Sequence, residues 1–283
     1  MILIADSGST KADWKIIMPS GDIQFQSTNG FNPFFQDSET IETTLRKQFT
    51  DELKKDEATE VYYYGAGCSD DIRCEIVAVA LRKLFPNAEI HVNHDLLAAA
   101  RALCGDQPGI ACILGTGSNS CLYDGKEVID NVDNMGSFVG DEGSGMHIGK
   151  ELLKGYFYRE MPEELIPIFE EFCSDGKQGI LSNIYDNDTP NVYLASFSRF
   201  MSENRDYLYI QRIVFNCFEE FIKRHVQKYE GHTKLDIHFV GSVAFYFRDI
   251  LNLVLEMKSL TLGNIIKQPI DSLMLYHQTK IKA

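Results

Sequence analysis

Short apolar runs and amphipathic stretches alternate through the first third of the chain. Apolar runs bounded by turn residues are typical of strands, and apolar residues four positions apart are typical of one face of a helix. The predicted strands are 2–5, 12–18, 23–28, 60–64 and 89–92, and the predicted helices are 38–53, 72–85 and 96–103. This β-β-β-α-β-α-β-α order predicts a mixed sheet with helices packed on it.

The same pattern begins again after the turn residues 105–109. Three further short strands are predicted, followed by a long segment that is mainly helical and by one more strand. These strands are 110–114, 120–123, 128–132 and 235–240, and the helical segment is 143–231, with a break at 186–190. The two halves share this order but almost no sequence identity. The chain is therefore predicted to form two α/β domains that are related in pattern alone.

Two turns built from glycine and hydroxyl residues follow apolar strands, and they lie about a hundred positions apart. They are residues 6–11 (Asp-Ser-Gly-Ser-Thr-Lys) and 115–120 (Gly-Thr-Gly-Ser-Asn-Ser). Glycine lets backbone N–H groups approach an anionic oxygen closely, and Ser or Thr adds a short donor. Neither turn has the spacing of a P-loop or of the dinucleotide fingerprint, and a tight hairpin turn is the alternative interpretation of each. The pair predicts a phosphate held between two lobes.

Composition and charge limit the classes of function. The chain has 283 residues, of which 44% are hydrophobic and 24% charged, and its net charge is −14. An acidic chain whose only basic cluster is Lys54-Lys55 is not expected to bind nucleic acid. No apolar run reaches membrane length, and the N-terminus has no basic region or cleavage site. We therefore expect no membrane partner and a cytoplasmic location.

The cysteines and histidines do not predict a metal site. The seven cysteines are odd in number and contain no Cys-x-x-Cys pair, so they are expected to be buried, reduced thiols. No cluster of carboxylates and histidines has the spacing of zinc ligands. No structural metal is expected.

Three carboxylates stand at positions that suit chemistry on a phosphate. Asp6 ends the first strand, in a turn composition that is also common in hairpins. Asp95 follows an apolar strand and precedes a helix, where it faces the open end of the sheet or serves as an ordinary N-cap. Asp141 lies among the glycines of residues 140–145, before a helix predicted to start near Met146. Chance turn chemistry is the alternative for Asp141, and acidic residues are favoured in a first helical turn in any case.

Five motifs resemble, in order and spacing, the BadF/BadG/BcrA/BcrD ATPase-like family, whose closest characterised branch is the eukaryotic-type N-acetylglucosamine kinase. They are Asp6-x-Gly8-x-Thr10-Lys11, Asn93-x-Asp95, Gly115-Thr-Gly-Ser-Asn119, Gly140-Asp-Glu-Gly-Ser144 and Val240-Gly-Ser-Val243. The resemblance covers roughly the whole chain. It implies an α/β fold of two ribonuclease-H-like, actin-like ATPase domains with a ligand cleft between them. The domains would be 1–107 and 108–269, the second with a helical insertion, and a C-terminal helix at about 270–283 can pack back on the first.

The resemblance also implies an activity and roles for individual residues. The activity is that of an ATP-dependent kinase, acting on a hydroxyl of an amino sugar such as N-acetylglucosamine or glucosamine, with ATP and Mg²⁺ as cofactors. Asp95 is implied as the general base, and Asp6 as the carboxylate that holds Mg²⁺ through water. The other implied nucleotide contacts are Gly8, Ser9, Thr10, Lys11, Gly115, Thr116, Gly117, Gly241 and Ser242. The implied sugar contacts are Asn32, Gly67, Thr116, Asn119, Gly136 and Asp141, with Asn29 as the alternative to Asn32.

The sequence departs from the kinase branch in two places. Met135-Gly136 stands where that branch has a Trp-Gly pair, which weakens the inference to N-acetylglucosamine itself. The chain is also short after Gly241, so the adenosine side is matched least. The sugar, the phosphorylated hydroxyl, the nucleotide preference and the presence of a homodimer are left open.

Two other functions compete with the kinase interpretation. Some members of the same family are ATPases that activate a partner enzyme through an iron–sulfur cluster, which needs closely placed cysteines near a glycine-rich turn. Here Cys112 and Cys121 lie within a predicted hairpin instead. A non-catalytic sugar-binding protein or actin-like assembly protein would tolerate loss of the base, whereas Asp6, Asp95 and Asp141 are all present.

Overall fold

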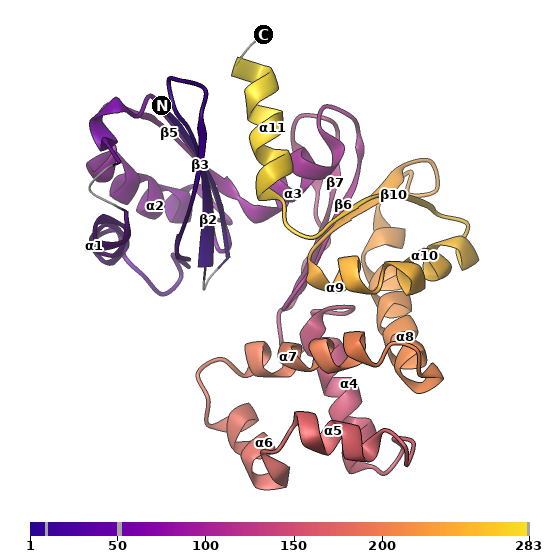
Figure 1. Ribbon diagram of the computed structural model, residues 1–283. Helices are drawn as coiled ribbons and strands as arrows, with labels where there is room; N and C mark the ends of the chain where they lie inside the picture. Colours follow the sequence, from indigo (N-terminus) through magenta and orange to yellow (C-terminus); the bar gives the residue numbers. More distant parts are fainter. Residues whose placement is uncertain (9–10, 50–52, 282–283) are drawn as a thin grey trace. The chain divides into compact units, whose positions relative to one another are not determined.

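The computed structural model describes residues 1–8, 11–49 and 53–281 (Figure 1). The chain forms two compact units, and each has its own sheet. The N-terminal unit comprises Met1–Asp106 and Pro269–Ala283, and the C-terminal unit comprises Gln107–Gln268. The C-terminal end of the chain therefore belongs to the N-terminal unit.

The sheet of the N-terminal unit has the strand order β3-β2-β1-β4-β5. Its strands are β1 (Ile2–Ser7), β2 (Lys11–Ile17), β3 (Ile23–Asn29), β4 (Glu60–Gly65) and β5 (Glu89–His94). β2 is antiparallel to both β1 and β3, whereas β4 is parallel to β1 and β5 is parallel to β4. The carboxyl ends of β1, β4 and β5 therefore meet at one edge, the edge at which open α/β sheets bind ligands.

Helices cover both faces of this sheet (Figure 1). One face is covered by α1 (Ser38–Gln48) and α2 (Asp71–Leu84), and the other by α3 (Asp95–Cys104) and α11 (Ile270–Ile281). The short helix η1 (Lys55–Glu57) follows α1 in the sequence. Side chains alternate along β1, so Leu3 packs into the core beneath α1 and α2 while Ile4 packs against α3 and α11. The core beneath α1 and α2 includes Trp14, whose ring centroid lies 5.0 Å from that of Phe49.

The helix predicted at 38–53 is shorter in the structure. α1 begins after Asp37, whose side chain accepts a hydrogen bond from the backbone N–H of Thr40, as expected of an N-cap. It ends at Gln48, because Phe49 adopts an extended backbone conformation and turns its ring into the core. Residues 50–52 lie outside the described part of the chain.

His277 holds α11 against β4 from a buried position. The residue is 3% exposed, its Nε2 lies 2.8 Å from the hydroxyl of Tyr64, and its ring centroid lies 3.9 Å from that of Tyr62. Burial, helped by the charges of Arg101 and His91, lowers the pKa of His277 to about 3. His277 is therefore neutral in the folded protein at pH 5, whereas a histidine in an unfolded chain is mostly protonated there.

We expect acidification to lower the free energy of unfolding, because between pH 6.5 and pH 3 only the unfolded chain gains a proton at His277. The loss from this residue between pH 7 and pH 5 is about 2 kcal/mol. Urea denaturation of the wild type and of His277→Gln at both pH values measures it. The variant should be less stable at pH 7 and should lose less stability at pH 5. An equal pH dependence of the two proteins would contradict the assignment.

The sheet of the C-terminal unit has the order β10-β9-β6-β7-β8. Its strands are β6 (Gly109–Leu114), β7 (Ser118–Tyr123), β8 (Val128–Asp130), β9 (Asp236–Val240) and β10 (Thr261–Ile266). β6, β7 and β8 pair antiparallel in succession, whereas β9 is parallel to β6 and β10 to β9. Strand order and directions repeat those of the first sheet, so the predicted duplication of the pattern is confirmed.

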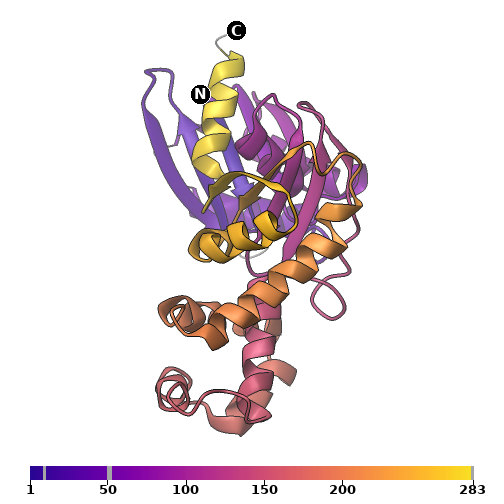
Figure 2. The same cartoon turned by 90° about the vertical axis from the view of Figure 1, so that its right-hand side faces the viewer.

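The helices of this unit lie mostly between β8 and β9. They are α4 (Gly145–Phe157), α5 (Ile166–Phe172), α6 (Gly176–Tyr185), α7 (Pro190–Glu203), α8 (Leu208–Arg224) and the short η2 (Val226–Lys228), followed after β9 by α9 (Ser242–Tyr246) and α10 (Arg248–Met257). Figures 1 and 2 show α5 and α6 near the end of α4 that is away from the sheet. The predicted helical segment is confirmed, and its predicted break lies between α6 and α7. β10, α9 and α10 have no counterpart among the predicted elements.

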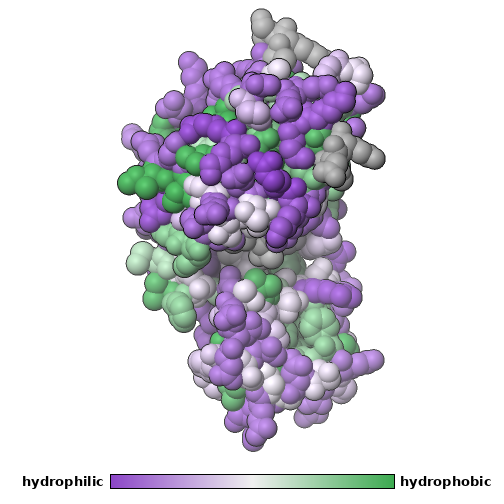
Figure 3. Space-filling model, turned by 90° about the vertical axis from the view of Figure 1, so that its left-hand side faces the viewer, coloured by the Kyte–Doolittle hydropathy of each residue, from purple (hydrophilic) through white to green (hydrophobic). Residues whose placement is uncertain are grey.

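Hydrophilic side chains dominate the face shown in Figure 3, with smaller hydrophobic patches between them. Large hydrophobic side chains that are exposed include Phe34 and Phe35 in the N-terminal unit and Phe138 in the C-terminal unit. Within the described residues, no helix has both the length and the apolar character that a membrane span requires.

Candidate active site

Three carboxylates gather at the carboxyl edge of the first sheet. Asp6 lies near the end of β1, directly opposite Asp13 of the antiparallel strand β2. Asp95 is the first residue of α3, immediately after β5. Burial of the Asp6 carboxyl, together with the smaller effects of the negative charges of Asp95 and Asp13, raises its pKa to about 7. The structure thus brings Asp6 and Asp95, both predicted from their strand ends, into one electrostatic cluster.

Of these carboxylates, Asp13 has its own counter-charge. Lys11 Nζ lies 2.8 Å from Asp13 Oδ1, and the hydroxyl of Ser27 donates to the same oxygen at 2.6 Å. The Lys11 side chain is 59% exposed, so Lys11 fits a solvated lysine at the start of a strand as well as it fits a phosphate contact. Asp6 makes no side-chain hydrogen bond or ion pair among the residues that the structure describes. Its buried, repelled carboxylate fits a hard cation such as Mg²⁺, which takes carboxylate and water oxygens.

Asp95 is not the N-cap of α3, which corrects one of the alternatives for this residue. The cap is His94, whose Nδ1 accepts a hydrogen bond from the backbone N–H of Leu96 at 3.1 Å. His94 has the extended conformation that a cap requires, and the helix starts one residue later. The Asp95 carboxylate is therefore not used for capping. Its Oδ1 lies 3.5 Å from Nδ1 of His94.

The turn after β1 is closed by a close backbone approach. The N–H of Gly8 donates to the carbonyl of Lys11 at 2.9 Å. A Cβ on Gly30 would lie 1.9 Å from the Gly8 carbonyl oxygen, so only glycine fits where the segment after β3 crosses this turn. Ser9 and Thr10, two of the predicted phosphate contacts, lie outside the described residues.

Two predicted sugar contacts of the N-terminal unit lie together. Gly67 has a φ of +78°, and a Cβ there would lie 2.5 Å from Oδ1 of Asn32. The Asn32 Oδ1 accepts a hydrogen bond from the backbone N–H of Phe34, which fixes the side chain in a tight turn. Asn29 lies at the end of β3, exposed and paired with Lys11 of β2. Position therefore groups Asn32, rather than Asn29, with Gly67.

The second glycine-rich turn joins β6 to β7, and the start of α4 and the end of β9 both lie against it. The first N–H groups of α4 donate to it, from Gly145 to the carbonyl of Gly115 at 2.8 Å and from Met146 to that of Thr116 at 3.2 Å. Gly241, at the end of β9, has a φ of +127°, and a Cβ there would lie 2.1 Å from the carbonyl oxygen of Leu114. The predicted residues Gly115, Thr116, Gly117, Gly241 and Ser242 are thus brought together at one edge of the second sheet.

Asp141 packs against the same turn from the segment before α4 and is almost completely buried, with 9% exposure. Its Oδ1 accepts hydrogen bonds from the backbone N–H of Ser118 at 2.9 Å and from Nδ2 of Asn134 at 2.7 Å. A Cβ on Gly117 would lie 2.9 Å from that oxygen. Asp141 has a φ of 59°, a left-handed conformation that is rare outside glycine. It precedes α4 without belonging to its first turn, where no acidic residue is found, so a first-turn preference does not explain Asp141.

The remaining predicted sugar contacts lie nearby in the same unit. Asn119 follows the turn on β7, and its Oδ1 accepts hydrogen bonds from the backbone N–H of Ser120 and from Nδ2 of Asn131. Gly136, with a φ of +71°, donates its N–H to Oδ1 of Asn134 at 2.9 Å. Asn134 therefore connects Gly136 with Asp141.

Sequence reasoning missed three residues of this region. Ser118 is 5% exposed, and its hydroxyl has no hydrogen-bond partner within the described part of the chain. Glu142 is held by Nε2 of His225 at 3.2 Å and by Nε of Arg224 at 3.4 Å, which ties the acidic motif to the end of α8. Asn134 is the third. Ser118 and Glu142 stand inside predicted motifs, but nothing in the sequence marks Asn134.

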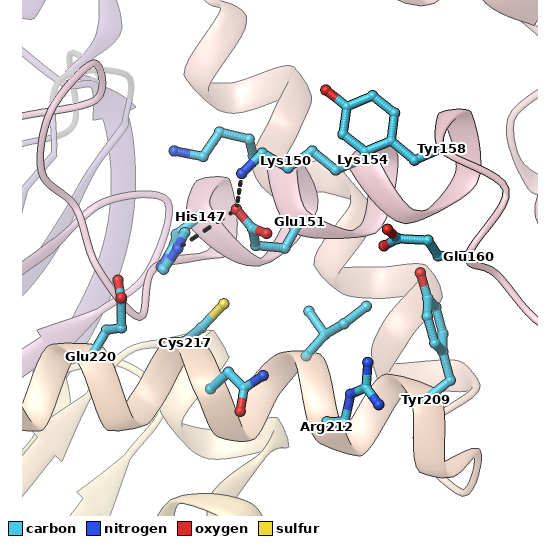
Figure 4. A pocket seen from close by; sticks show the side chains of 12 residues that line it. His147, Lys150, Glu151, Lys154, Tyr158, Glu160, Tyr209, Arg212, Cys217 and Glu220 are labelled. Atoms are coloured by element: carbon cyan, nitrogen blue, oxygen red, sulfur yellow. Dashed lines mark hydrogen bonds and ion pairs between the residues drawn. The ribbon is translucent and has the colours of Figure 1, made fainter.

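A separate groove lies between α4 and α8 (Figure 4). Its volume is about 570 Å³, and it contains none of the predicted site residues. Lys154 is paired with Glu151 at 2.6 Å, and burial raises the pKa of the Cys217 thiol, which leaves it unreactive. Acidic and basic side chains alternate along the groove, so it lacks the uniformly positive potential that would attract a polyphosphate.

No family model matches the chain, and no curated protein matches it. Among solved structures, a Porphyromonas gingivalis protein proposed to be an N-acetylglucosamine kinase is 40% identical over 99% of this chain and 100% of its own, with a TM-score of 0.94. A Chromobacterium violaceum protein proposed to be an N-acetylglucosamine kinase is 16% identical over 97% of this chain and 98% of its own, with a TM-score of 0.71. A Cytophaga hutchinsonii protein proposed to be a sugar kinase is 15% identical over the full length of both chains, with a TM-score of 0.51.

Two α/β units of one topology, matched over the whole chain, define the actin-like, two-domain fold of sugar kinases. The Chromobacterium and Cytophaga structures support this fold alone. The identity to the Porphyromonas protein goes further, because it is high and extends over both complete chains. The chain belongs to the N-acetylglucosamine kinase-like family of that protein.

Proposed function

We propose that this chain is an ATP-dependent kinase that transfers the terminal phosphoryl group of ATP to a hydroxyl of an amino sugar such as N-acetylglucosamine or glucosamine. The observation that carries the proposal is the full-length identity of 40% to the Porphyromonas protein. The two carboxylate sites, at Asp6 with Asp95 and at Asp141, support it independently, because phosphoryl transfer needs a base, a metal site and hydroxyl acceptors.

In the proposed reaction, each predicted residue has one task, except Thr116, which contacts both phosphate and sugar. Asp95 accepts the proton of the attacking sugar hydroxyl, since its carboxylate is not engaged in helix capping. Asp6 holds Mg²⁺ through water, and bound Mg²⁺ neutralises charge on the phosphate oxygens. The turn residues Gly8–Lys11 and Gly115–Gly117 contact the phosphates, and Gly241 and Ser242 lie beside adenosine. Asn32, Gly67, Thr116, Asn119, Gly136 and Asp141 contact the sugar.

The geometry of two cysteines disfavours the rival function as an iron–sulfur activator. Cys112 faces Ser120 and Cys121 faces Ala111 across the β6–β7 pair. Side chains alternate along a strand, so the two cysteines point to opposite faces of the sheet. Both are also fully buried, and they cannot together bind one cluster shared with a second subunit. Membership of the BadF/BadG/BcrA/BcrD family, a cleft between the domains, a homodimer and a cytoplasmic location stay predictions.

A coupled assay of ADP release tests the proposed function. The purified protein is given Mg-ATP and a panel of amino sugars, neutral sugars and no sugar. We expect ADP release that depends on an amino sugar, with the phosphorylated product identified by mass spectrometry. ADP release that is independent of every sugar would favour the ATPase alternative. Sugar binding without ADP release would favour the non-catalytic alternative.

A further inference from the structure

One side chain, Asn134, organises the loop that carries Asp141. Its Nδ2 donates to Oδ1 of Asp141 at 2.7 Å and to the carbonyl of Ser118. Its Oδ1 accepts from the backbone N–H of Asp141 at 3.1 Å and from that of Gly136 at 2.9 Å. Asn134 thus bonds both the backbone and the carboxylate of Asp141 and ties them to the turn between β6 and β7.

These bonds determine which oxygen of Asp141 stays available. Oδ1 already accepts two hydrogen bonds, from Ser118 N–H and from Asn134. Oδ2 has no hydrogen-bond partner among the described residues, although Asp141 is only 9% exposed. The hydroxyl of Ser118, whose backbone N–H bonds Asp141, is buried and has no partner in the described chain. A buried hydroxyl without a partner is costly, so this hydroxyl and the unused Oδ2 of Asp141 point to a polar ligand that supplies the missing bonds.

The backbone of Asp141 also depends on this side chain. A φ of 59° is unfavourable for a residue other than glycine, and such conformations persist when surrounding contacts fix them. The hydrogen bond from Asp141 N–H to Asn134 Oδ1 supplies such a contact. Gly140 leaves room for it, because a Cβ there would lie 2.6 Å from the same oxygen.

We propose that Asn134 is a positioning residue for sugar recognition: it saturates Oδ1 of Asp141, fixes the left-handed backbone, and leaves Oδ2 as the acceptor for sugar hydroxyls. The inference rests on the proposed function. Asn134 acts through Asp141 and has no contact of its own with the sugar. Its effect therefore falls on sugar affinity and requires the Asp141 carboxylate.

The primary test compares Asn134→Ala with Asp133→Ala, a neighbour that is exposed and makes no side-chain hydrogen bond within the described residues. Asn134→Ala should raise the KM and Kd for the sugar about tenfold, as expected when a buried carboxylate loses one donor and its orientation. The KM for ATP and kcat should change by less than about threefold. Asp133→Ala should leave all of these constants unchanged.

A double-mutant cycle separates positioning from general support of the fold. In an Asp141→Ala background, Asn134→Ala should change the sugar Kd by much less than in the wild-type background, because the carboxylate it orients is gone and only its bonds to backbone groups remain. Isothermal titration of the sugar against the four proteins, with a non-hydrolysable ATP analogue as the folding control, measures this coupling. An equal loss in both backgrounds, or no loss in the wild-type background, would overturn the proposal.

A second variant keeps the test decisive if Asn134→Ala does not fold. Gly140→Ala leaves Asn134 in place but presses a methyl group against its Oδ1 and against the backbone nitrogen of Met135, at a position whose φ is not left-handed. It should weaken sugar binding in the same direction while ATP-analogue binding persists, and unchanged sugar affinity would count against the proposal. A wild type that binds no sugar of the panel would refute the proposed function, and with it any role of Asn134 in recognition. Sugar binding with additive variants would refute only the role of Asn134.

Discussion

Replacing Asp95 by asparagine is expected to lower kcat for sugar phosphorylation by about a hundredfold to ten-thousandfold, the range typical for loss of a general base. Asparagine keeps the size of the side chain and removes its ability to accept a proton. The helix should not be disturbed, because His94 and not Asp95 caps α3. Initial rates of ADP release at saturating sugar and Mg-ATP measure the effect, and thermal unfolding checks that the variant is folded.

Asp71 provides a matched control for this substitution. Like Asp95, it is the first residue of a helix of the N-terminal unit, and the residue before it, Asp70, is the N-cap. Asp71→Asn makes the same chemical change at the same helical position, so kcat should be unchanged. Near-normal turnover in a folded Asp95→Asn enzyme would end the assignment of Asp95 as the base. An equal loss in both variants would point to a general effect of charge on the unit.

The sheet topology could be predicted because it follows from local patterns. Apolar runs separated by glycine-rich turns marked β1 to β3 and, about a hundred residues later, β6 to β8. The strand β10, which was not predicted, shows the limit of this reasoning. Its apolar residues are interrupted by Gly263 and Asn264, and its pairing with β9 shifts register between Leu262 and Ile265. A bulge of this kind breaks the alternation on which the prediction of a strand depends.

The site was predictable where it depends on the ends of strands. Parallel strands align their carboxyl ends, so Asp6 and Asp95 could be expected at one edge from the order of elements alone. The cap of α3 could not be predicted, because Asp is a stronger N-cap residue than His. The helix starts one residue later than that preference suggests, and this shift to His94 depends on the exact end of β5. Asn134 could not be found either, since its bonds depend on a folded loop rather than on a sequence motif.

Replacing Asp6 by asparagine is expected to lower kcat/KM for Mg-ATP by about tenfold to a hundredfold, the usual cost of losing an outer-sphere partner of a metal. The stability of the ligand-free protein should move in the opposite direction. The pKa of Asp6 is raised to about 7, so the folded state bears the cost of a buried carboxylate above that pH. At pH 8 the neutral amide removes this cost, and Tm should rise or stay unchanged.

This opposition between activity and stability distinguishes a metal site from a structural turn. Mg²⁺ titrations of the rate, sugar titrations by calorimetry and thermal unfolding at pH 8 give the three readouts. Sugar affinity should hold in Asp6→Asn. Glu89→Ala, at the opposite end of the parallel strands, should change neither rate nor Mg²⁺ dependence. A lower Tm together with parallel losses of Mg-ATP use and sugar binding would show that Asp6 supports the fold of the turn, and the metal would then have to be held elsewhere.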